Sequence, residues 1–405
     1  MNIDQQVAYL MQGTAYGDES LKEAMEKELR ERLVAAQKAG RPLQVYCGFD
    51  PRTTDLHLGH TVPMRKLRQF QELGHEVTFL IGNYTSLIGD PSDKDVLRPQ
   101  LTSEQVEQNG RTYAEQAFRI LDKEKTRIRY NAEWLASLTF EELIKLASNF
   151  TIQQFMTREN FKKRWEKGDA VYLHETFYSI MQGYDAYAMR SDVQVGGTDQ
   201  LFNIMTAARK IMTYKGVLPN IAIIVDILPG TDGVVKMSKS LGNHIPINTN
   251  AEDMYGKMMS IPDSAMPSFS RLVTRWTPDI IEAREKAQAD GSLHPRDAKM
   301  QLAYEVVSTF WGEEGAARGQ EAFVSMFQKK DVPDEMPDVQ LLPGQTLLDV
   351  LESAGLVESR GQGRRLLVQN GVKLDGEVIT DAFLVPGAGV LQVGKRKFVR
   401  LLAAK

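Results

Sequence analysis

The sequence predicts an α/β protein whose first domain is built on a parallel β-sheet with covering helices. From residue 45 onward, short apolar runs typical of buried strands alternate with amphipathic stretches typical of helices. Residues 251–330 then show helical periodicity without strand patterns, and the last sixty or so residues combine a short helix with a hairpin signal. These observations indicate a Rossmann-like domain with a helical insertion, then an α-helical domain, then a small C-terminal α+β domain.

Length, composition and charge agree with this division. The chain has 405 residues, enough for two or three domains, and 42% hydrophobic with 25% charged residues is ordinary for a globular protein. A single cysteine provides no disulfide framework, and no apolar run reaches the length of a membrane-spanning helix. We therefore expect a cytoplasmic protein without membrane contact. The expected domains are 1–232 with an insertion at about 94–170, 233–330, and 345–405 after a linker over 331–344.

The first strand and helix surround two histidines. Val45–Phe49 is expected to be a buried strand, and an amphipathic helix is expected to begin near Gly59–Thr61 and to end at Gly74. His57 and His60 then lie at a helix start, where free N–H groups and the helix dipole favour an anion such as phosphate. Histidines that only cap the helix are an equally good interpretation. A metal site is disfavoured, because no cysteine or third histidine lies nearby.

A second strand is expected over Glu76–Gly82, and polar residues follow it. In open α/β sheets ligands bind at the carboxyl ends of the strands, so Asp90 is expected in the same crevice as His57. Helices expected over 103–121, 139–148 and 151–167 form the insertion, whose scattered arginines indicate a charged surface rather than an RNA site. Asn131, within this insertion, is expected to face the crevice.

The helix expected over His174–Ala188 carries a polar trio on a buried face. Tyr178, Gln182 and Asp185 are spaced four and three residues apart, so they project from one side of the helix. The rest of the helix is apolar and aromatic, which indicates burial, and a buried carboxyl group needs partners because its desolvation is costly. We expect a ligand pocket here, with a hydrogen-bonded core network as the alternative.

Two later loops complete the expected crevice. Residues 193–200 read as a strand that runs into a glycine turn, which places Asp199 and Gln200 at a helix start close to a ligand. Residues 236–240 read KMSKS and follow the strand expected over Ile221–Leu228. The two lysines of this KMSKS loop are suited to neutralise charge on a polyphosphate as pyrophosphate leaves. On its own, a loop of this composition is more often a solvated turn.

The C-terminal tail differs from the rest of the chain in charge. From Leu341 onward it holds nine Lys or Arg against six Asp or Glu, a net of +3, which leaves −7 for the remainder. A short helix is expected to carry Arg360, Arg364 and Arg365, and Lys373 stands just before an Asp-Gly hairpin turn. Segregated positive charge is typical of a module that binds the phosphate backbone of a nucleic acid.

Together these motifs resemble the bacterial tyrosyl-tRNA synthetases, a family of class I aminoacyl-tRNA synthetases. The H-x-G-H motif at residues 57–60 and the KMSKS loop, about 180 residues apart, are the paired signature of the class. The segments 46–51, 178–185 and 196–200 narrow the resemblance to the tyrosine family. The likeness spans essentially the whole chain, and the tail is similar to an S-four-type RNA-binding domain.

The resemblance implies a tyrosine–tRNA ligase that converts ATP and L-tyrosine to tyrosyl-adenylate and pyrophosphate, then transfers the tyrosyl group to the 3′ end of tRNA(Tyr). It also implies Mg2+ carried by ATP, no metal site in the protein itself, and a symmetric homodimer. The implied tyrosine site consists of Tyr46, Asp90, Tyr178, Gln182, Asp185 and Gln200. The implied ATP site consists of Gly48, Asp50, His57, Gly59, His60, Asp199, Lys236, Met237, Ser238, Lys239 and Ser240. The implied catalytic residues are His57, His60, Thr85, Lys236 and Lys239, and the implied RNA-binding residues are Arg360, Arg364, Arg365 and Lys373.

Three positions depart from the family pattern, and other functions share some of the motifs. Arg52 stands where many members have threonine, which leaves its contact with ATP open, and Leu201-Phe202 replaces a common Trp-Gly pair. A tryptophanyl-tRNA synthetase is disfavoured by Asp185 and the basic tail. A metabolic nucleotidyltransferase would need neither the tail nor both lysines of the KMSKS loop. A module that only recognises RNA would need neither Asp185 nor Lys239.

Overall fold

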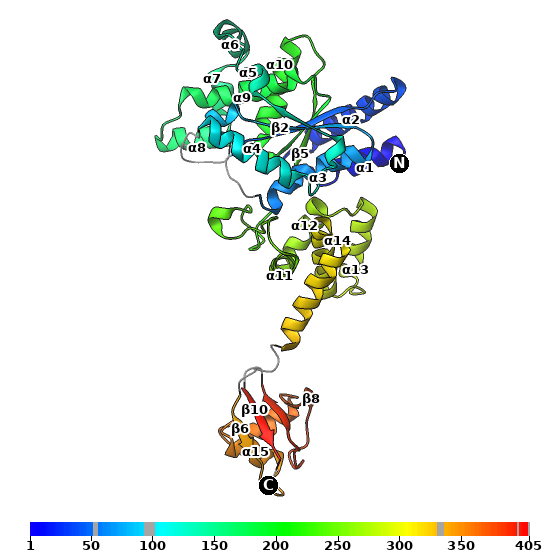
Figure 1. Cartoon of the computed structure of the whole chain (residues 1–405), viewed down its shortest axis with the longest axis vertical. Coiled ribbons are helices and arrows are strands. Elements are labelled where there is room, and N and C mark those ends of the chain that lie inside the picture. The colour runs from blue at the N-terminus through cyan, green and yellow to red at the C-terminus, as the bar shows by residue number, and fades with distance from the viewer. Residues whose placement is uncertain (52–55, 93–101, 330–335, 395–396, 404–405) are drawn as a thin grey trace. The chain divides into compact units, whose positions relative to one another are not determined.

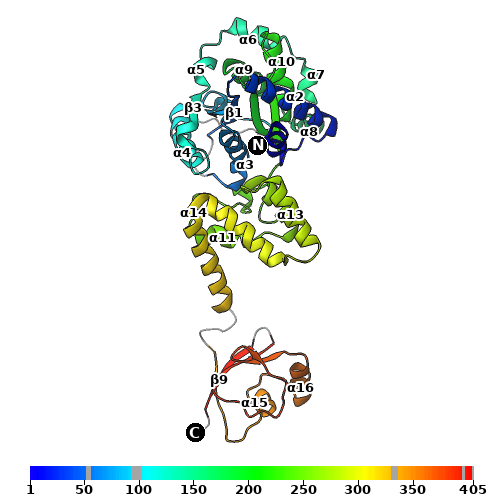
Figure 2. The same cartoon turned by 90° about the vertical axis from the view of Figure 1, so that its right-hand side faces the viewer.

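The computed structural model describes residues 1–51, 56–92, 102–329, 336–394 and 397–403. The chain forms two compact units, Met1–Gln320 and Glu321–Lys405. Figures 1 and 2 show an α/β domain followed by a helical region in the first unit, and a small domain with its own sheet in the second.

A five-stranded parallel sheet forms the centre of the first unit. Its strands are β1 (Gln44–Phe49), β2 (Glu76–Ile81), β3 (Thr126–Tyr130), β4 (Val193–Gly197) and β5 (Ile221–Val225), in the spatial order β3-β2-β1-β4-β5. Val45 of β1 pairs with Val77 on one side and Val193 on the other. All five residues of β5 are buried, as expected for a parallel strand covered on both faces. The predicted Rossmann-like α/β class is confirmed.

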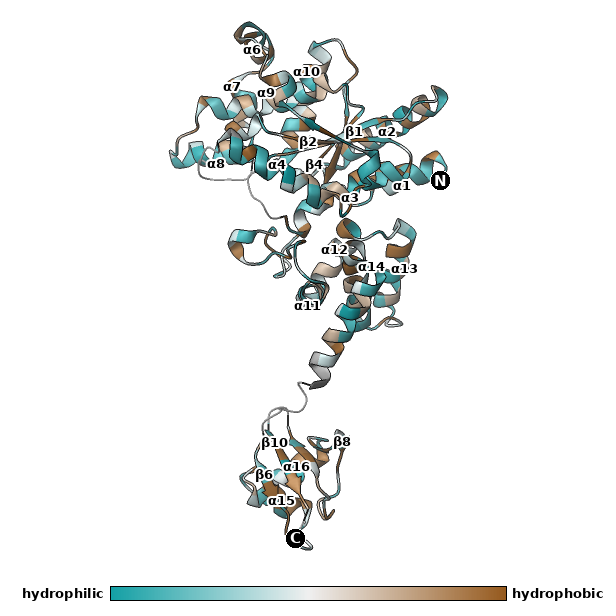
Figure 3. Cartoon of the chain, in the orientation of Figure 1, coloured by the Kyte–Doolittle hydropathy of each residue, from teal (hydrophilic) through white to brown (hydrophobic). Residues whose placement is uncertain are grey.

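Helices cover both faces of this sheet. Tyr46 of β1 and Leu80 of β2 pack against Ala186, Ala208 and Met212, which lie on the helices at one face. Neighbouring strand residues point to the other face, and Figure 3 shows the brown, apolar strands enclosed by helices with teal outer surfaces. The helices of this domain are α1 (Ile3–Met11), α2 (Glu19–Lys38), α3 (Leu58–Glu72), α4 (Ser103–Ala117), α5 (Ala132–Leu135), α6 (Phe140–Ala147), α7 (Ile152–Met156), α8 (Glu159–Lys167), α9 (Leu173–Ala188), the π-helix η4 (Phe202–Ala208) and α10 (Arg209–Tyr214).

The insertion differs from its prediction in two respects. It contributes β3, which pairs with β2 at the edge of the sheet, whereas only helices were expected there. The single helix expected over 151–167 is also wrong, because Arg158 has extended backbone (φ −67°, ψ 128°) and separates α7 from α8. Of the range expected as the insertion, residues 94–101 lie outside the described part of the chain.

The rest of the first unit is helical. Its helices are α11 (Ala251–Ser260), α12 (Met266–Val273), α13 (Pro278–Ala289) and α14 (Pro295–Lys329), which is broken by non-helical backbone at Gly312 and whose residues after Gln320 belong to the second unit. The N-terminal segment ties this region to the α/β domain. Buried Lys66 of α3 donates to the carbonyl oxygens of Leu10 and Gln12, each at 2.8 Å, and the Gln12 amide donates to the Trp276 carbonyl at 3.2 Å.

The second unit contains a mixed sheet with the order β6-β10-β9-β7-β8 and two helices. Its core is made by leucine and valine side chains such as Leu347, Leu351 and Leu391. The strand β6 lies within the range expected as a linker, so residues 338–340 belong to the sheet instead. The elements are β6 (Asp338–Gln340), α15 (Leu347–Ser353), α16 (Arg360–Val368), β7 (Val372–Leu374), β8 (Glu377–Val378), β9 (Gly389–Val393) and β10 (Lys397–Leu402). Across the described ranges of both units, no helix combines the length and apolarity needed to span a membrane.

Candidate active site

A buried carboxyl group lies at the base of the candidate site. Asp185 of α9 is 2% exposed and accepts hydrogen bonds from Trp134 Nε1 at 2.7 Å and from Asn131 Nδ2 at 3.2 Å. Burial raises the pKa of Asp185 to about 8, these two hydrogen bonds oppose the shift, and the charge of Asp50 adds to it. The carboxyl group is therefore largely neutral at pH 7, held by two donors in an apolar setting.

Buried polar atoms without partners lie on the elements beside this carboxyl group. The hydroxyl of Tyr46 on β1 is buried and has no hydrogen-bond partner. Burial, followed by the charge of Asp185, holds the pKa of Tyr46 well above its ordinary value, which indicates that the two groups are close. The Gln182 Oε1 atom is also buried without a partner. Such atoms are costly unless a ligand satisfies them, so this part of the structure is suited to bind a polar group.

A chain of hydrogen bonds connects Asp185 to the adjacent strand ends. Asn131 Nδ2 also donates to Thr85 Oγ1 at 3.0 Å, and Thr85 Oγ1 donates to Asp50 Oδ1 at 2.8 Å. Tyr178 joins this group, because burial and then the charges of Asp50 and Asp90, with a hydrogen bond to Asp50, hold its pKa well above the ordinary value. Four residues predicted for the site and Asn131 thus form one network.

A second group of predicted residues is centred on Asp90. Its Oδ2 atom accepts a hydrogen bond from the Gln200 amide, and its Oδ1 atom accepts the Ser92 N–H at 2.8 Å. Gln200 Oε1 in turn accepts from Asn203 at 2.9 Å. This arrangement links the loop after β2 with the segment after β4, as the pairing of strand ends predicts.

The two histidines lie at the start of α3. His57 Nδ1 accepts the Gly59 N–H, and His60 Nδ1 accepts the His57 N–H, both at 3.2 Å, so the rings cap the helix. Burial, followed by the charges of His60, His244 and Lys236, lowers the pKa of His57 to about 2. The neutral His57 ring accepts at Nδ1, so its proton is on Nε2, which can donate to an anion. His57 can therefore cap the helix through Nδ1 and still donate to a phosphate through Nε2, so the capping and phosphate-binding interpretations are compatible.

The KMSKS loop reaches the same crevice. Lys236 Nζ lies 3.3 Å from Asp199 Oδ2, and Met237 is buried against the start of α3. A Cβ atom at Gly59 would lie 3.0 Å from His57 Cε1 and 3.6 Å from Met237 Cβ, so the close packing here favours glycine. The Oδ1 atom of Asn243 accepts the N–H of loop residue 238 at 2.8 Å and so helps to fix the loop.

The remaining predicted residues are less closely connected. A Cβ atom added at Gly48 would meet Leu80 only at ordinary contact distance, Lys239 is exposed on the KMSKS loop, and the hydroxyl groups of Ser238 and Ser240 are 2.9 Å apart. Arg52 lies outside the described residues. In the second unit, Arg364 and Arg365 are exposed on α16 and Lys373 is half-buried on β7, whereas Arg360 is paired with Asp349 and with Glu352 at 2.9 Å.

Sequence reasoning missed three residues near the site. Trp134 follows Asn131 by three residues, so helical spacing gave a weak signal, but nothing indicated that its indole would reach Asp185. His244 follows the KMSKS loop, and its ring centre lies 6.2 Å from that of His57. Arg158 lies close to Asp90 although it comes from the insertion, which was expected to be only a charged surface.

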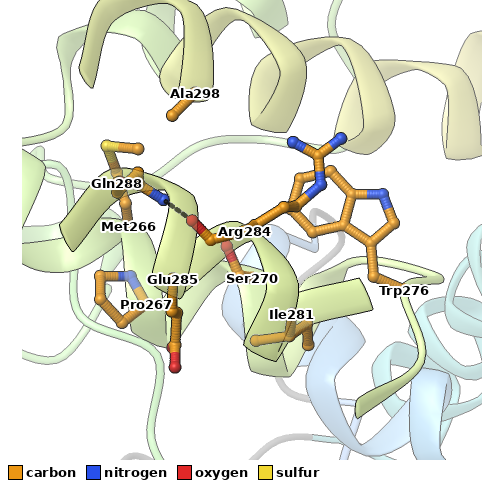
Figure 4. Close-up of a pocket in the computed structure, with 9 residues that line it drawn as sticks. All are labelled: Met266, Pro267, Ser270, Trp276, Ile281, Arg284, Glu285, Gln288 and Ala298. Carbon is orange, nitrogen blue, oxygen red and sulfur yellow. Dashed lines mark hydrogen bonds between the residues drawn. The ribbon is translucent and has the colours of Figure 1, made fainter. Parts of the chain in front are cut away.

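Two further features, which concern metal binding and a small pocket, do not involve the residues predicted for the site. Over the described residues, no cluster of three His, Cys, Asp or Glu side chains is arranged to hold a metal ion. A small pocket among α12, α13 and α14 includes none of the predicted site residues (Figure 4). In it the Arg284 guanidinium stacks 4.0 Å from the centre of the Trp276 ring.

Two family models match the chain. The model described as tRNA synthetases class I (W and Y) matches residues 37–328, and the S4 domain model matches residues 345–387. The first match covers most of the first unit, with all the residues described around the crevice. The second lies within the small C-terminal domain and covers the predicted basic helix.

Named relatives are similar over almost their whole length. The tyrosine–tRNA ligase of Thermotoga maritima is 46% identical over 379 residues, which cover 93% of each chain. That of Geobacter sulfurreducens is 43% identical over 410 residues, which cover both chains completely. Among solved structures, a C-terminally truncated mitochondrial tyrosyl-tRNA synthetase of Aspergillus nidulans has a TM-score of 0.63 at 22% identity and covers 80% of this chain and 94% of that one. The Archaeoglobus fulgidus enzyme complexed with L-tyrosine has a TM-score of 0.60 at 20% identity, with 79% and 100% covered. Both structures support the fold.

Proposed function

Because the chain belongs to the class I tRNA synthetase family of the tryptophan and tyrosine enzymes, we propose that it ligates tyrosine to tRNA. It activates L-tyrosine with ATP to tyrosyl-adenylate and pyrophosphate, then transfers the tyrosyl group to the 3′ end of tRNA(Tyr). The observation that carries the choice of amino acid is the buried Asp185 carboxyl group beside the unpaired Tyr46 hydroxyl. A phenolic hydroxyl group between them would give both a hydrogen-bond partner.

The other polar residues of the pocket are assigned to the amino acid backbone. Asp90, Tyr178 and Gln182 take the α-ammonium group, with Gln200 beside Asp90. Their hydrogen bonds and burial support this assignment, since Asp90 and Gln200 are already joined and Gln182 has an unpaired buried oxygen. The α-carboxylate of tyrosine is then directed toward the crevice between the phosphate-binding motifs.

ATP occupies the crevice between the start of α3 and the KMSKS loop. His57 can donate from Nε2 to a phosphate oxygen, and the lack of a side chain at Gly59 lets the His57 ring pack closely against the start of α3. Gly48, Asp50, Asp199 and His60 complete the ATP site, and Thr85 positions Asp50 through their hydrogen bond. Mg2+ belongs to this proposal as an ion carried by the ATP phosphates, which is its usual mode of binding.

The tyrosine carboxylate is itself the nucleophile that attacks the α-phosphate, so no covalent enzyme intermediate is needed. Catalysis then depends on alignment of the two substrates and on positive charge around the departing pyrophosphate. Lys236 and Lys239 supply this charge. The ion pair of Lys236 with Asp199 is partly exposed and therefore weak, so Lys236 can exchange it for a phosphate contact. Met237, Ser238 and Ser240 shape the loop that carries both lysines.

A tryptophan ligase is the main rival within the same family. An indole ring offers one N–H donor and no acceptor. It would leave either the Tyr46 hydroxyl or the proton of the neutral Asp185 carboxyl group without an acceptor in the pocket. The phenol of tyrosine can both donate and accept, which suits this pair better.

The small C-terminal domain is proposed to bind tRNA through its basic helix. Arg364, Arg365 and Lys373 provide positive charge, and Arg360 contributes after exchange of its surface ion pairs. A chain that ends after Lys329 is expected to form tyrosyl-adenylate at nearly the parent rate. Its charging of tRNA at low tRNA concentration should fall by at least about 10-fold, because phosphate contacts are lost.

Pyrophosphate exchange and tRNA charging, measured on the same two proteins, test this division. The cut is placed before β6, so that no strand of the lost sheet remains. An equal loss of both activities would contradict the separate role of the domain. Equal charging by both proteins would contradict its role in binding tRNA.

We also propose that the protein acts in the cytoplasm as a homodimer. Helices α6 to α9 present large apolar side chains to solvent, including Phe140 at 77% exposure, Trp165 at 68% and Leu173 at 65%. Large exposed apolar side chains mark an interface where they form a contiguous patch, which a second copy of the chain would cover. Sedimentation of the parent and of a Leu173→Asp variant tests the proposal: the parent should be dimeric and the variant monomeric, whereas a monomeric parent would refute it.

A further inference from the structure

Arg158 is a buried cation of the insertion that the proposed chemistry does not use. It precedes α8, is 6% exposed, and its guanidinium carbon lies 4.9 Å from the centre of the Phe161 ring and 5.3 Å from that of Phe202. Burying a guanidinium group is costly unless its N–H groups are paired. The partners of this group therefore indicate what the residue does.

The guanidinium group of Arg158 holds the loop that carries Asp90. Nη2 donates to Ser92 Oγ at 2.6 Å, and Nη1 donates to Ser179 Oγ of α9 at 2.9 Å. Asp90 Oδ1 lies 4.0 Å from Nη2. Two residues later in the chain, Asn160 donates its side-chain amide to the carbonyl oxygen between Asp90 and Ser92. The insertion is thus hydrogen-bonded to this loop at two adjacent residues, Pro91 and Ser92.

The same contacts continue to the far side of Asp90. Its Oδ2 atom accepts from Gln200, and Gln200 accepts from Asn203 at 2.9 Å. Asn203 also accepts the hydroxyl hydrogen of Ser179 at 2.7 Å, and Ser179 is the second partner of Arg158. The contacts form a closed ring, so a displacement of the guanidinium group would disturb both Asp90 and the Gln200 amide that is bonded to it.

We propose that Arg158 is a positioning residue for the α-amino group of the amino acid substrate, because it fixes the loop Gly89–Ser92 so that Asp90 faces the amine. The inference rests on the proposed function, of which it specifies one subsite. Arg158 acts through Asp90 and does not touch the substrate. Its planar fork serves two hydroxyl groups at once, which the single ammonium group of lysine, on a shorter side chain, cannot reproduce.

Arg164 on the same helix provides a matched control. It is also buried, and its guanidinium carbon lies 6.0 Å from the centre of the same Phe161 ring. Its partners are the two carboxylate oxygens of Glu175, at 2.7 and 2.9 Å, and the carbonyl oxygen of Ala170, and not the loop of Asp90. A defect that arises only from destabilising α8 should therefore appear in variants of both arginines.

The test compares two ligands by calorimetric titration of the parent, Arg158→Lys and Arg164→Lys proteins. L-Tyrosine carries the amino group, and 3-(4-hydroxyphenyl)propanoate has the same ring and carboxylate without it. Arg158→Lys is expected to raise the Kd of tyrosine by about 10-fold to 100-fold and to leave the Kd of the propanoate unchanged. Arg164→Lys is expected to change neither.

Three results would overturn the proposal: unchanged tyrosine binding in Arg158→Lys, an equal loss of both ligands, or the same amine-selective loss in Arg164→Lys. If Arg158→Lys fails to fold, Ser92→Ala serves instead, since it removes one acceptor of the guanidinium group and should weaken tyrosine binding alone. Failure of the proposed function is distinguishable, because the parent protein would then bind no tyrosine.

Discussion

Replacing Asp185 by asparagine is expected to lower kcat/KM for tyrosine activation by about 100-fold to 1,000-fold. The carboxyl group accepts from Trp134 and Asn131 and is assigned the phenol of the substrate as a third partner. An asparagine offers one acceptor oxygen, and its amide hydrogens would face a donor. Activation of phenylalanine should change much less, since it has no hydroxyl group to lose. Pyrophosphate exchange with both amino acids measures the ratio of kcat/KM for tyrosine to that for phenylalanine.

Asp192→Asn is the matched control for this variant. Asp192 is also buried, but its partners are Arg32, Arg41 and the Gln44 N–H, so its loss should lower stability without changing the tyrosine-to-phenylalanine ratio. A ratio unchanged in Asp185→Asn, or equally changed in Asp192→Asn, would contradict the assignment of the phenol site.

Asp185→Asn is also expected to change how the stability of the protein depends on pH, and this effect is independent of tyrosine recognition. Because the folded pKa of Asp185 is raised to about 8, the folded protein binds more protons than the unfolded chain between about pH 4 and pH 8. This contribution to stability is complete below pH 4 and is lost as the pH rises through 8. The melting temperature of the parent should therefore fall more steeply between pH 6 and pH 9 than that of Asp185→Asn.

Replacing either lysine of the KMSKS loop by alanine is expected to lower kcat for adenylate formation by about 100-fold to 1,000-fold. Lys236 and Lys239 are proposed to act on charge that develops as pyrophosphate leaves, so the KM for tyrosine should change little. Single-turnover formation of tyrosyl-adenylate measures the step directly.

Lys210→Ala provides the comparison for the two loop variants. Lys210 belongs to α10, donates to Gln154 and lies over the Phe150 ring, among residues of the insertion. It should leave adenylate formation unchanged. A raised tyrosine KM with unchanged kcat in Lys236→Ala or Lys239→Ala would show that these lysines bind the ground state and would contradict the account.

Strong local periodicity explains which parts of the fold were predicted. β1, α3 and α9 each combine a clear apolar pattern with a strong boundary signal, so their positions differ from expectation by a residue or two. β3 was missed because its sequence, TRIRY, alternates two arginines with three β-formers, and at a sheet edge the arginines remain exposed. The break at Arg158 was missed because most partners of its guanidinium group, such as Ser92 and Phe202, are distant in the sequence.

The candidate site shows the same limit. Helical spacing placed Tyr178, Gln182 and Asp185 on one face, and the positions of Asp90 and Gln200 after expected strands placed both at the crevice, where the structure joins them. Trp134 and Arg158 act through contacts with residues 51 and 68 positions away in the chain, which no local pattern encodes. Long-range side-chain partners therefore required the structure, whereas the groups proposed to touch the substrates were visible in the motifs.

Amino-acid-dependent exchange of pyrophosphate into ATP, measured on the parent protein with tyrosine, phenylalanine and tryptophan, tests the central assignment most directly. If the buried Asp185 carboxyl group and the neighbouring Tyr46 hydroxyl group select a phenol, tyrosine alone should support exchange above background. Exchange supported by tryptophan, by phenylalanine as well as tyrosine, or by none of the three would contradict it.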